Sequence, residues 1–218
     1  LNSSLFQKQF DTNKNKQSLI TDIIYTSDTS FNDKGLSSDF KLLFKNPNIR
    51  EKTGSKNQSS TNTKLLTKLM YTMSYPLKKE GEFYNSFLKP KLSLRFSPNN
   101  TKNMSNEDRR LDISSISSIN RLGISDGVEG GQSLTTGLEY SFRDKSGEEK
   151  ISLNLSQVLR DKANPDLPKN STLNNKYSDI IGNIKFDLFD NLNFEYDFMV
   201  DNNLDKLNYN SIDTSLTV

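Results

Sequence analysis

Apolar and polar residues alternate one by one along much of this chain, a spacing that puts successive side chains on opposite faces of a β-strand. In the clearest stretch, residues 134–142, every second residue from Leu134 to Phe142 is apolar or Thr, and the residues between them are small or polar. The alternating stretches run for about 9 to 12 residues, whereas globular strands run for about 5 to 6 and outer-membrane strands for about 9 to 11. Strand length is therefore the first indication of a membrane β-barrel.

Similar alternation elsewhere predicts about nine antiparallel strands in all. Two turns support the pairing of neighbours: residues 144–147 predict one hairpin, and Asp190-Asn191 predicts a tight two-residue turn. We therefore predict an all-β fold, an antiparallel transmembrane β-barrel wall segment that belongs to a larger barrel. The remaining strands are expected around residues 19–25, 40–44, 65–75, 88–96, 151–155, 180–188 and 192–200, with a less regular one from about Lys206.

The low content of hydrophobic residues, 32%, would be typical of disorder or of a poorly filled core in a soluble protein. A barrel wall explains it, because such a wall needs only about one apolar residue in two, with polar residues facing a wet lumen. Charged residues do occur in mid-strand, for example Lys89, Lys91 and Arg95. A soluble β-sandwich or β-solenoid gives the same alternation over short windows, although no repeat with a period of about 20 to 50 residues supports the solenoid.

The connections between the predicted strands are alternately short and long. Outer-membrane barrels have short periplasmic turns and longer extracellular loops, so this rhythm favours a barrel over a sandwich. The connection at residues 201–205 is an exception, because it is short where a long loop is expected. In chain order, the others are short at 26–35, long at 46–62, short at 78–85, very long at 97–132, short at 143–149, long at 161–177 and minimal at 190–191.

The residue types that are missing exclude several kinds of chemistry. With no Cys and no His, these residues cannot build a thiolate or imidazole zinc site, a Cys nucleophile or a Ser-His-Asp triad. A net charge of +2 is too small for a typical nucleic-acid-binding protein. The Asp11, Asn13 and Asn15 spacing lacks the Gly and Glu of a calcium loop, and residues 127–131 lack the Lys-Ser/Thr ending of a phosphate loop. We therefore expect no enzyme activity, no cofactor, no metal site and no nucleic-acid partner.

The two ends of the chain predict a fragment. It begins at Leu1 without Met and stops at Val218 within an alternating segment, and it holds no run of about 18 apolar residues that could form a membrane-spanning helix. We expect residues 1–218 to be part of a single outer-membrane β-barrel domain, with a long loop at about 97–132. The charge run at residues 107–110 in that loop is expected to be solvated; the alternative is a loop that folds inward and constricts the pore.

One stretch carries a family resemblance. Residues 118–140, SINRLGISDGVEGGQSLTTGLEY, resemble the barrel of the lipopolysaccharide-assembly protein family LptD, in which an Asn/Asp-Arg pair, a Gly, an Asp, an acidic or polar residue and a strand with Leu-x-x-Gly recur in this order. The similarity extends from about Phe40 to Val200 and is strongest between residues 88 and 157. This chain departs from the family at Gly127, where Arg is common, and at Ser156, where Gly is common before Gln157.

The resemblance implies a large barrel in the outer membrane of Gram-negative bacteria that transports and assembles lipopolysaccharide. The barrel would receive its substrate from periplasmic lipopolysaccharide-bridge proteins, pass it through a lumen and a lateral opening, and be plugged by an LptE-like lipoprotein, with membrane lipid outside. We expect Arg121, Asp126 and Glu129 to fix the long loop or to meet saccharide and phosphate groups. Two other functions stay open: a secreted or surface β-rich binding protein such as an adhesin, and another outer-membrane barrel such as a nutrient receptor or porin.

Overall fold

The computed structural model describes residues 1–10, 14–52, 59–189 and 192–216 of the chain, which are almost entirely strands and loops. Among these residues, no helix is long and apolar enough to cross a membrane. The strands are β1 (Asn2–Phe10), β2 (Lys14–Thr26), β3 (Ser30–Phe31), β4 (Ser37–Lys52), β5 (Ser59–Thr63), β6 (Leu66–Ser74), β7 (Leu77–Glu80), β8 (Tyr84–Ser97), β9 (Gly131–Asp144), β10 (Glu149–Arg160), β11 (Ile180–Phe189), β12 (Leu192–Val200) and β13 (Leu207–Leu216), with a short helix α1 (Ile113–Ile116) and a 3-10 turn η1 (Lys169–Ser171).

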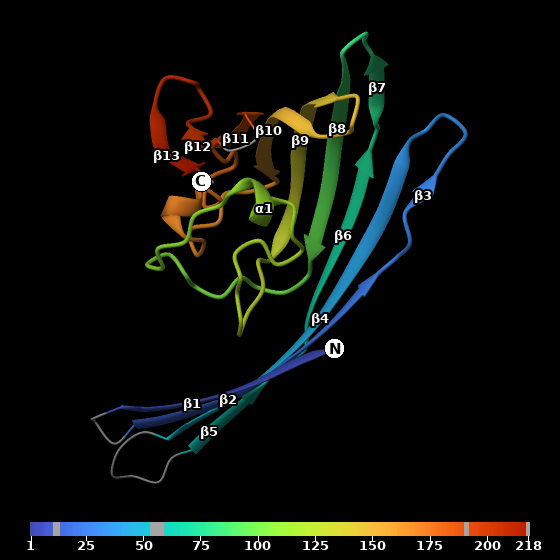
Figure 1. The fold of residues 1–218 in the computed structure, drawn as a ribbon. Coiled ribbons are helices and arrows are strands. Elements are labelled where there is room, and N and C mark those ends of the chain that lie inside the picture. The colour runs from blue at the N-terminus through green and yellow to red at the C-terminus, as the bar shows by residue number, and fades with distance from the viewer. Residues whose placement is uncertain (11–13, 53–58, 190–191, 217–218) are drawn as a thin grey trace.

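All strands belong to one antiparallel sheet. Its main path is β1-β2-β4-β6-β8-β9-β10-β11-β12-β13, and the short strands β3, β5 and β7 extend the pairing of β4 and β8. Figure 1 shows these strands side by side in a curved wall, with α1 and the long loops gathered in front of one face. The prediction of an all-β, antiparallel wall is confirmed, and within the described residues β1 is the one strand of the main path that was not predicted.

The strand register separates two chemically different faces. One row of paired residues runs Phe40, Tyr71, Leu94, Leu134, Leu159 across five strands. The next row, one residue along, runs Lys41, Met70, Arg95, Ser133, Arg160 on the opposite face. Because side chains alternate strictly along a strand, we call the first the outer face and the second the inner face of the wall.

The outer face exposes large apolar side chains without any covering element. Leu94 is 50% exposed and Phe96 46%, and Leu69, Tyr71 and Leu92 are also exposed. A soluble monomer rarely shows an apolar patch that continues over several strands. This face is therefore suited to lipid, as the alternation in the sequence predicted.

The buried core lies on the inner face, between the wall and the loops. Residues 98–130 and 161–179 fold back so that their apolar side chains pack against β10, β11 and β12. A second, smaller cluster joins the loop residues Ile119 and Val128 to Leu43, Leu66 and Met70 of the wall. The main cluster comprises Met104, Leu111, Ile116, Leu122, Ile124, Val158, Leu167, Leu173, Ile181 and Met199. The loops thus stand inside the curve of the wall.

Two predictions about the connections need a comment. The long loop expected at residues 46–62 was wrong in its extent, because β4 continues to Lys52 and β5 begins at Ser59, both within ladder pairing. The pairing continues there although the alternation that marks a lipid-facing strand has stopped. The predicted turn at Asp190-Asn191, as well as Asp11 and Asn13 of the calcium-like spacing, lie outside the described residues.

Candidate functional site

The carboxylate of Glu129, in the long loop, is buried between cations from the loop and from the wall. Arg121 Nε donates to Glu129 Oε2 over 2.9 Å, and Arg121 Nη2 and Arg160 Nη1 both donate to Oε1. Lys68 Nζ lies 3.6 Å from Oε2. Side chains of all four residues are at most 3% exposed. One carboxylate therefore ties the loop to β6 and β10.

A fourth cation, Arg95 of β8, binds the backbone of the same loop. Its Nη2 donates to Ile116 O over 2.7 Å and to Ser118 O over 3.0 Å, at the end of α1, and its Nη1 donates to Thr135 Oγ1 over 2.6 Å. Arg121 also reaches the Thr135 hydroxyl, over 3.3 Å. We refer to Lys68, Arg95, Arg121, Glu129 and Arg160 as the Glu129 cluster.

The cations of this cluster keep Glu129 ionised. Burial alone would raise the pKa of the Glu129 carboxyl, but the guanidinium of Arg121 and the ammonium of Lys68 outweigh it and hold this pKa well below its usual range. Buried charges are tolerated only when they are paired and hydrogen-bonded. The loop is therefore held by ion pairs between one carboxylate and three cations, which are shielded from water, and the carboxylate stays ionised at neutral pH.

A glycine allows Glu129 to reach this position. A Cβ atom on Gly130 would lie 2.0 Å from the backbone oxygen of Asn99, at the other end of the loop. Gly130 N donates to Thr101 Oγ1 over 2.9 Å, and Arg160 Nη2 donates to Gly130 O over 2.7 Å. The glycine-rich stretch therefore brings the two ends of the long loop together.

Two of the three site residues predicted from the sequence meet in the structure, and the third lies elsewhere. Arg121 and Glu129 are bonded to each other, whereas Asp126 bonds Lys102 within the loop, with Nζ–O distances of 2.7 and 2.8 Å. Burial would raise the pKa of Asp126, but Lys102 lowers it overall. A direct role of these three residues toward saccharide or phosphate stays a prediction. The sequence interpretation did not single out Lys68 or Arg160, because each reads as one more polar residue on a wet strand face.

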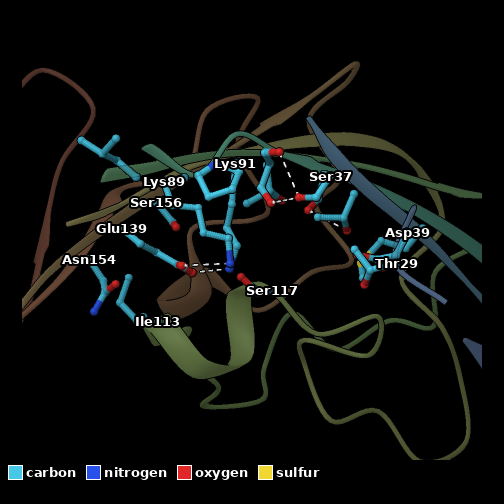
Figure 2. A pocket seen from close by; sticks show the side chains of 18 of the residues that line it. Thr29, Ser37, Asp39, Lys89, Lys91, Ile113, Ser117, Glu139, Asn154 and Ser156 are labelled. Atoms are coloured by element: carbon cyan, nitrogen blue, oxygen red, sulfur yellow. Dashed lines mark hydrogen bonds and ion pairs between the residues drawn. The ribbon is translucent and has the colours of Figure 1, made fainter. Parts of the chain in front are cut away.

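Beside the Glu129 cluster, the inner face holds a cavity of about 400 Å³. Its charged lining residues are Asp39, Lys41, Lys89, Lys91 and Glu139, and apolar, hydroxyl and amide side chains from β4, β6, β8, β9 and β10 complete it. Ile113 and Ser117, in α1 and just after it, line the side that faces the loop, as Figure 2 shows. Thr135 lines the cavity and also accepts from Arg95 and Arg121, so cavity and cluster adjoin.

Hydroxyl pairs make up much of the cavity lining. Ser37 Oγ and Ser74 Oγ are 2.7 Å apart, and Thr72 Oγ1 and Ser93 Oγ are 3.2 Å apart. Such groups both donate and accept hydrogen bonds, and the lysines add cationic donors. The arrangement can bind hydroxylated or anionic groups.

The chain matches the family described as LptD, LPS transport system D, over residues 40–217. No curated protein matches it. The matched range runs from within β4 to the end of β13 and contains both inner loops, the Glu129 cluster and most of the residues that line the cavity. The resemblance read from residues 118–140 is therefore confirmed, and the adhesin, receptor and porin alternatives keep no support beyond their shared strand pattern.

Proposed function

The chain belongs to the LptD family, an outer-membrane family of lipopolysaccharide transport and assembly, and on that premise we propose that residues 1–218 are one stretch of wall in a single lipopolysaccharide-transporting barrel. The observation that carries the proposal is the division of the sheet into two faces. The outer face exposes Leu94 and its paired neighbours to lipid, while the inner face turns lysines, hydroxyls and amides toward a lumen.

In this proposal the inner face forms hydrogen bonds with the saccharide part of lipopolysaccharide as it passes through the lumen. The chain performs no covalent chemistry. Sugar hydroxyls exchange hydrogen bonds with groups such as Ser37 and Thr72, while acyl chains stay on the apolar side. The loop of residues 98–130, fixed by the Glu129 cluster, narrows the lumen and sets which part of the wall the saccharide can touch.

The partners follow from the same premise. Periplasmic bridge proteins deliver lipopolysaccharide to the barrel, and an LptE-like lipoprotein fills the part of the lumen that the chain's own loops leave open. Membrane lipid covers the outer face. The short turns between β7 and β8 and between β9 and β10 face the periplasm, and the loops of residues 98–130 and 161–179 face the cell exterior.

Neighbouring residues on β8 give a direct test. Leu92→Cys and Lys91→Cys, introduced singly into the intact protein in native outer membranes, differ by one residue and should lie on opposite faces; both positions are exposed enough to react. A lipid-soluble maleimide should label the Leu92 variant, and a water-soluble maleimide that enters the lumen should label the Lys91 variant. Labelling of both variants to the same extent by the water-soluble maleimide would contradict the proposal.

Transport is tested separately, through the loop. Arg121→Gln and Glu129→Gln in the intact protein should lower the amount of newly made lipopolysaccharide that reaches the cell surface, whereas Asp126→Asn should leave it near normal. Normal surface delivery in both cluster variants would show that the fixed loop has no part in transport.

A further inference from the structure

We propose that the inner-face cavity is a binding site for an acidic sugar, a ring that carries a phosphate or a carboxylate, and that Glu139 occupies the place of its anionic group until the sugar arrives. The inference rests on the proposed function and specifies one binding site along that route. Lys89 and Lys91 supply the charge that recognises the anion. Lys41 and Asp39 of β4 line the same cavity, so its three lysines outnumber its two carboxylates by one.

The strand register explains why two lysines share one carboxylate. Lys89 and Lys91 are two residues apart on β8, so their side chains lie on the same face. Lys89 is paired directly with Glu139, and Lys91 with Gly137. Lys91 Nζ donates to Glu139 Oε1, and Lys89 Nζ lies 3.5 Å from Oε2. Two ammonium groups thus share a single carboxylate, which leaves one positive charge in excess.

Gly137 lets the side chains of Lys91 and Ser156 approach the backbone of β9. A Cβ atom there would lie 3.1 Å from Ser156 Oγ and 3.5 Å from the Cβ of Lys91. A larger residue at this register position would therefore push Lys91 or Ser156 away from its present place in the cavity lining.

Burial distinguishes this ion cluster from the one around Glu129. The side chains of Lys89, Lys91 and Glu139 are 40%, 26% and 39% exposed, whereas that of Glu129 is 3% exposed. Exposed Lys–Glu pairs contribute little to stability, so an incoming anion replaces Glu139 at small cost. Figure 2 shows Lys91 and Glu139 pointing toward each other in the open part of the cavity.

The rest of the lining fits a sugar ring better than a bare anion. The hydroxyl of Ser156 and the amide of Asn154, both partly exposed, offer partners for ring hydroxyls. Ile113 gives one apolar contact for the C–H face of a ring. A volume of about 400 Å³ lies in the ordinary range of small-ligand pockets, about 300–1,000 Å³.

A matched lysine on the same inner face serves as the control. Lys185 of β11 forms a Lys–Glu pair with Glu195 at 3.0 Å, and the two side chains are 51% and 36% exposed. The hollow around this pair is lined by two lysines, Lys150 and Lys185, and by four carboxylates, so its net charge disfavours an anion. The carboxylates are those of Glu149, Asp187, Glu195 and Asp213. Lys185→Gln therefore removes a similar pair from a place where the proposal expects no acidic sugar.

The experiment measures binding to the intact protein, purified in detergent, by ligand-observed NMR titration. The probes are glucose 6-phosphate, glucuronate, glucose and inorganic phosphate. Both charged sugars should bind more tightly than glucose and inorganic phosphate. Replacing both lysines, Lys89→Gln with Lys91→Gln, should weaken their binding by about tenfold or more, and Glu139→Gln should strengthen it by about three- to tenfold. Lys185→Gln should change nothing.

Several results would overturn the inference. These are glucose binding as tightly as the charged sugars, inorganic phosphate binding as tightly as glucose 6-phosphate, or charged-sugar affinity that the Lys89 and Lys91 changes leave intact. An unchanged affinity in Glu139→Gln would show that Glu139 does not compete for the site. Lys91→Arg, which keeps the charge, should retain binding and so guards against a loss due to misfolding.

The two proposals can fail independently. If the charged sugars bind as expected but lipopolysaccharide still reaches the surface normally in the Lys89 and Lys91 variant, the site exists and the proposed route along this wall is wrong. If the maleimide labelling assigns the two faces as proposed but no charged sugar binds, the route stands and the acidic-sugar site is wrong.

Discussion

Glu129→Gln should release the long loop from the wall while changing the side-chain volume very little. The substitution removes the only carboxylate that the described residues place within ion-pair distance of Arg121, Arg160 and Lys68. A neutral amide accepts one of these contacts weakly and repels others through its NH₂ group. Three buried cations then remain next to one another without a counter-charge.

The size of the effect follows from burial. Glu129 and its three cationic neighbours are at most 3% exposed, so water cannot replace the lost charge. Removing one partner from a buried, hydrogen-bonded ion pair typically costs about 3–5 kcal/mol. A loss of about 4 kcal/mol raises the population of the released loop roughly a thousandfold.

Hydrogen exchange at the loop amides measures this population. In the intact protein, exchange at residues 119–130 should accelerate by about a thousandfold in Glu129→Gln, while exchange in β9 and β10 changes little. Asp126→Asn is the control: Lys102, its partner, is 44% exposed, and such pairs are worth about 0–1 kcal/mol. An acceleration below about tenfold in Glu129→Gln, or an equal one in Asp126→Asn, would refute the ranking by burial.

Three further predictions concern pH, the loop ends and the outer face. The pKa of Glu129 is depressed in the fold, so the stability that its ion pairs give to the loop is complete above the usual carboxyl pKa and is lost only as the pH falls below about 4.5. Protease sensitivity of the loop should therefore stay constant from pH 7 to about pH 5. A rise in protease sensitivity near neutral pH would contradict this. Gly130→Ala puts a methyl group 2.0 Å from Asn99 O and should cost about 2 kcal/mol or more in urea unfolding; a wild-type midpoint would contradict it. Leu94→Lys should cost about 2–4 kcal/mol in lipid vesicles, and a stability equal to that of the wild type would argue against the assignment of faces.

The division into two faces could be predicted from the sequence because it is a local property. Side-chain direction alternates with a period of two whatever the neighbouring strand is. The face on which Leu94 and Leu134 lie can therefore be assigned before any strand pairing is known. Strand β1 escaped prediction because residues 2–10 carry no regular alternation. Its pairing with β2 continues from Asn2 to Phe10 through backbone hydrogen bonds, which need no particular side chains.

The same reasoning explains the error at residues 46–62. Pro47 and the polar residues around it read as a loop, yet Pro47 is paired with Ile20, and its carbonyl accepts from Lys64 N over 3.3 Å. Alternation of apolar and polar residues in a membrane wall indicates contact with lipid. Strands can pair through backbone hydrogen bonds without that alternation. The sequence therefore indicates where a strand leaves the apolar layer, not where the strand ends.

The site was only half predictable, since its charges come from distant parts of the chain. Arg121 and Glu129 lie in one motif, eight residues apart, and could be singled out together. Lys68 and Arg160 come from strands on either side of that loop, and each looks like an ordinary lumen-facing residue. Their burial depends on the loop folding back onto the wall, a long-range packing event that no local pattern encodes.

The inner face thus carries two carboxylates with opposite physical character. Glu129 is dry, and its cations are held by further hydrogen bonds such as that of Arg160 to Gly130 O. Glu139 is 39% exposed and its two lysines are 40% and 26% exposed, so solvent can reach the lysines when the carboxylate moves away. On the proposed route, we expect an anionic group to exchange with the carboxylate whose removal costs less, because the free-energy cost of separating an ion pair rises with burial. We therefore expect exchange at Glu139 before any disturbance of Glu129, so that the loop remains in place while the proposed substrate passes.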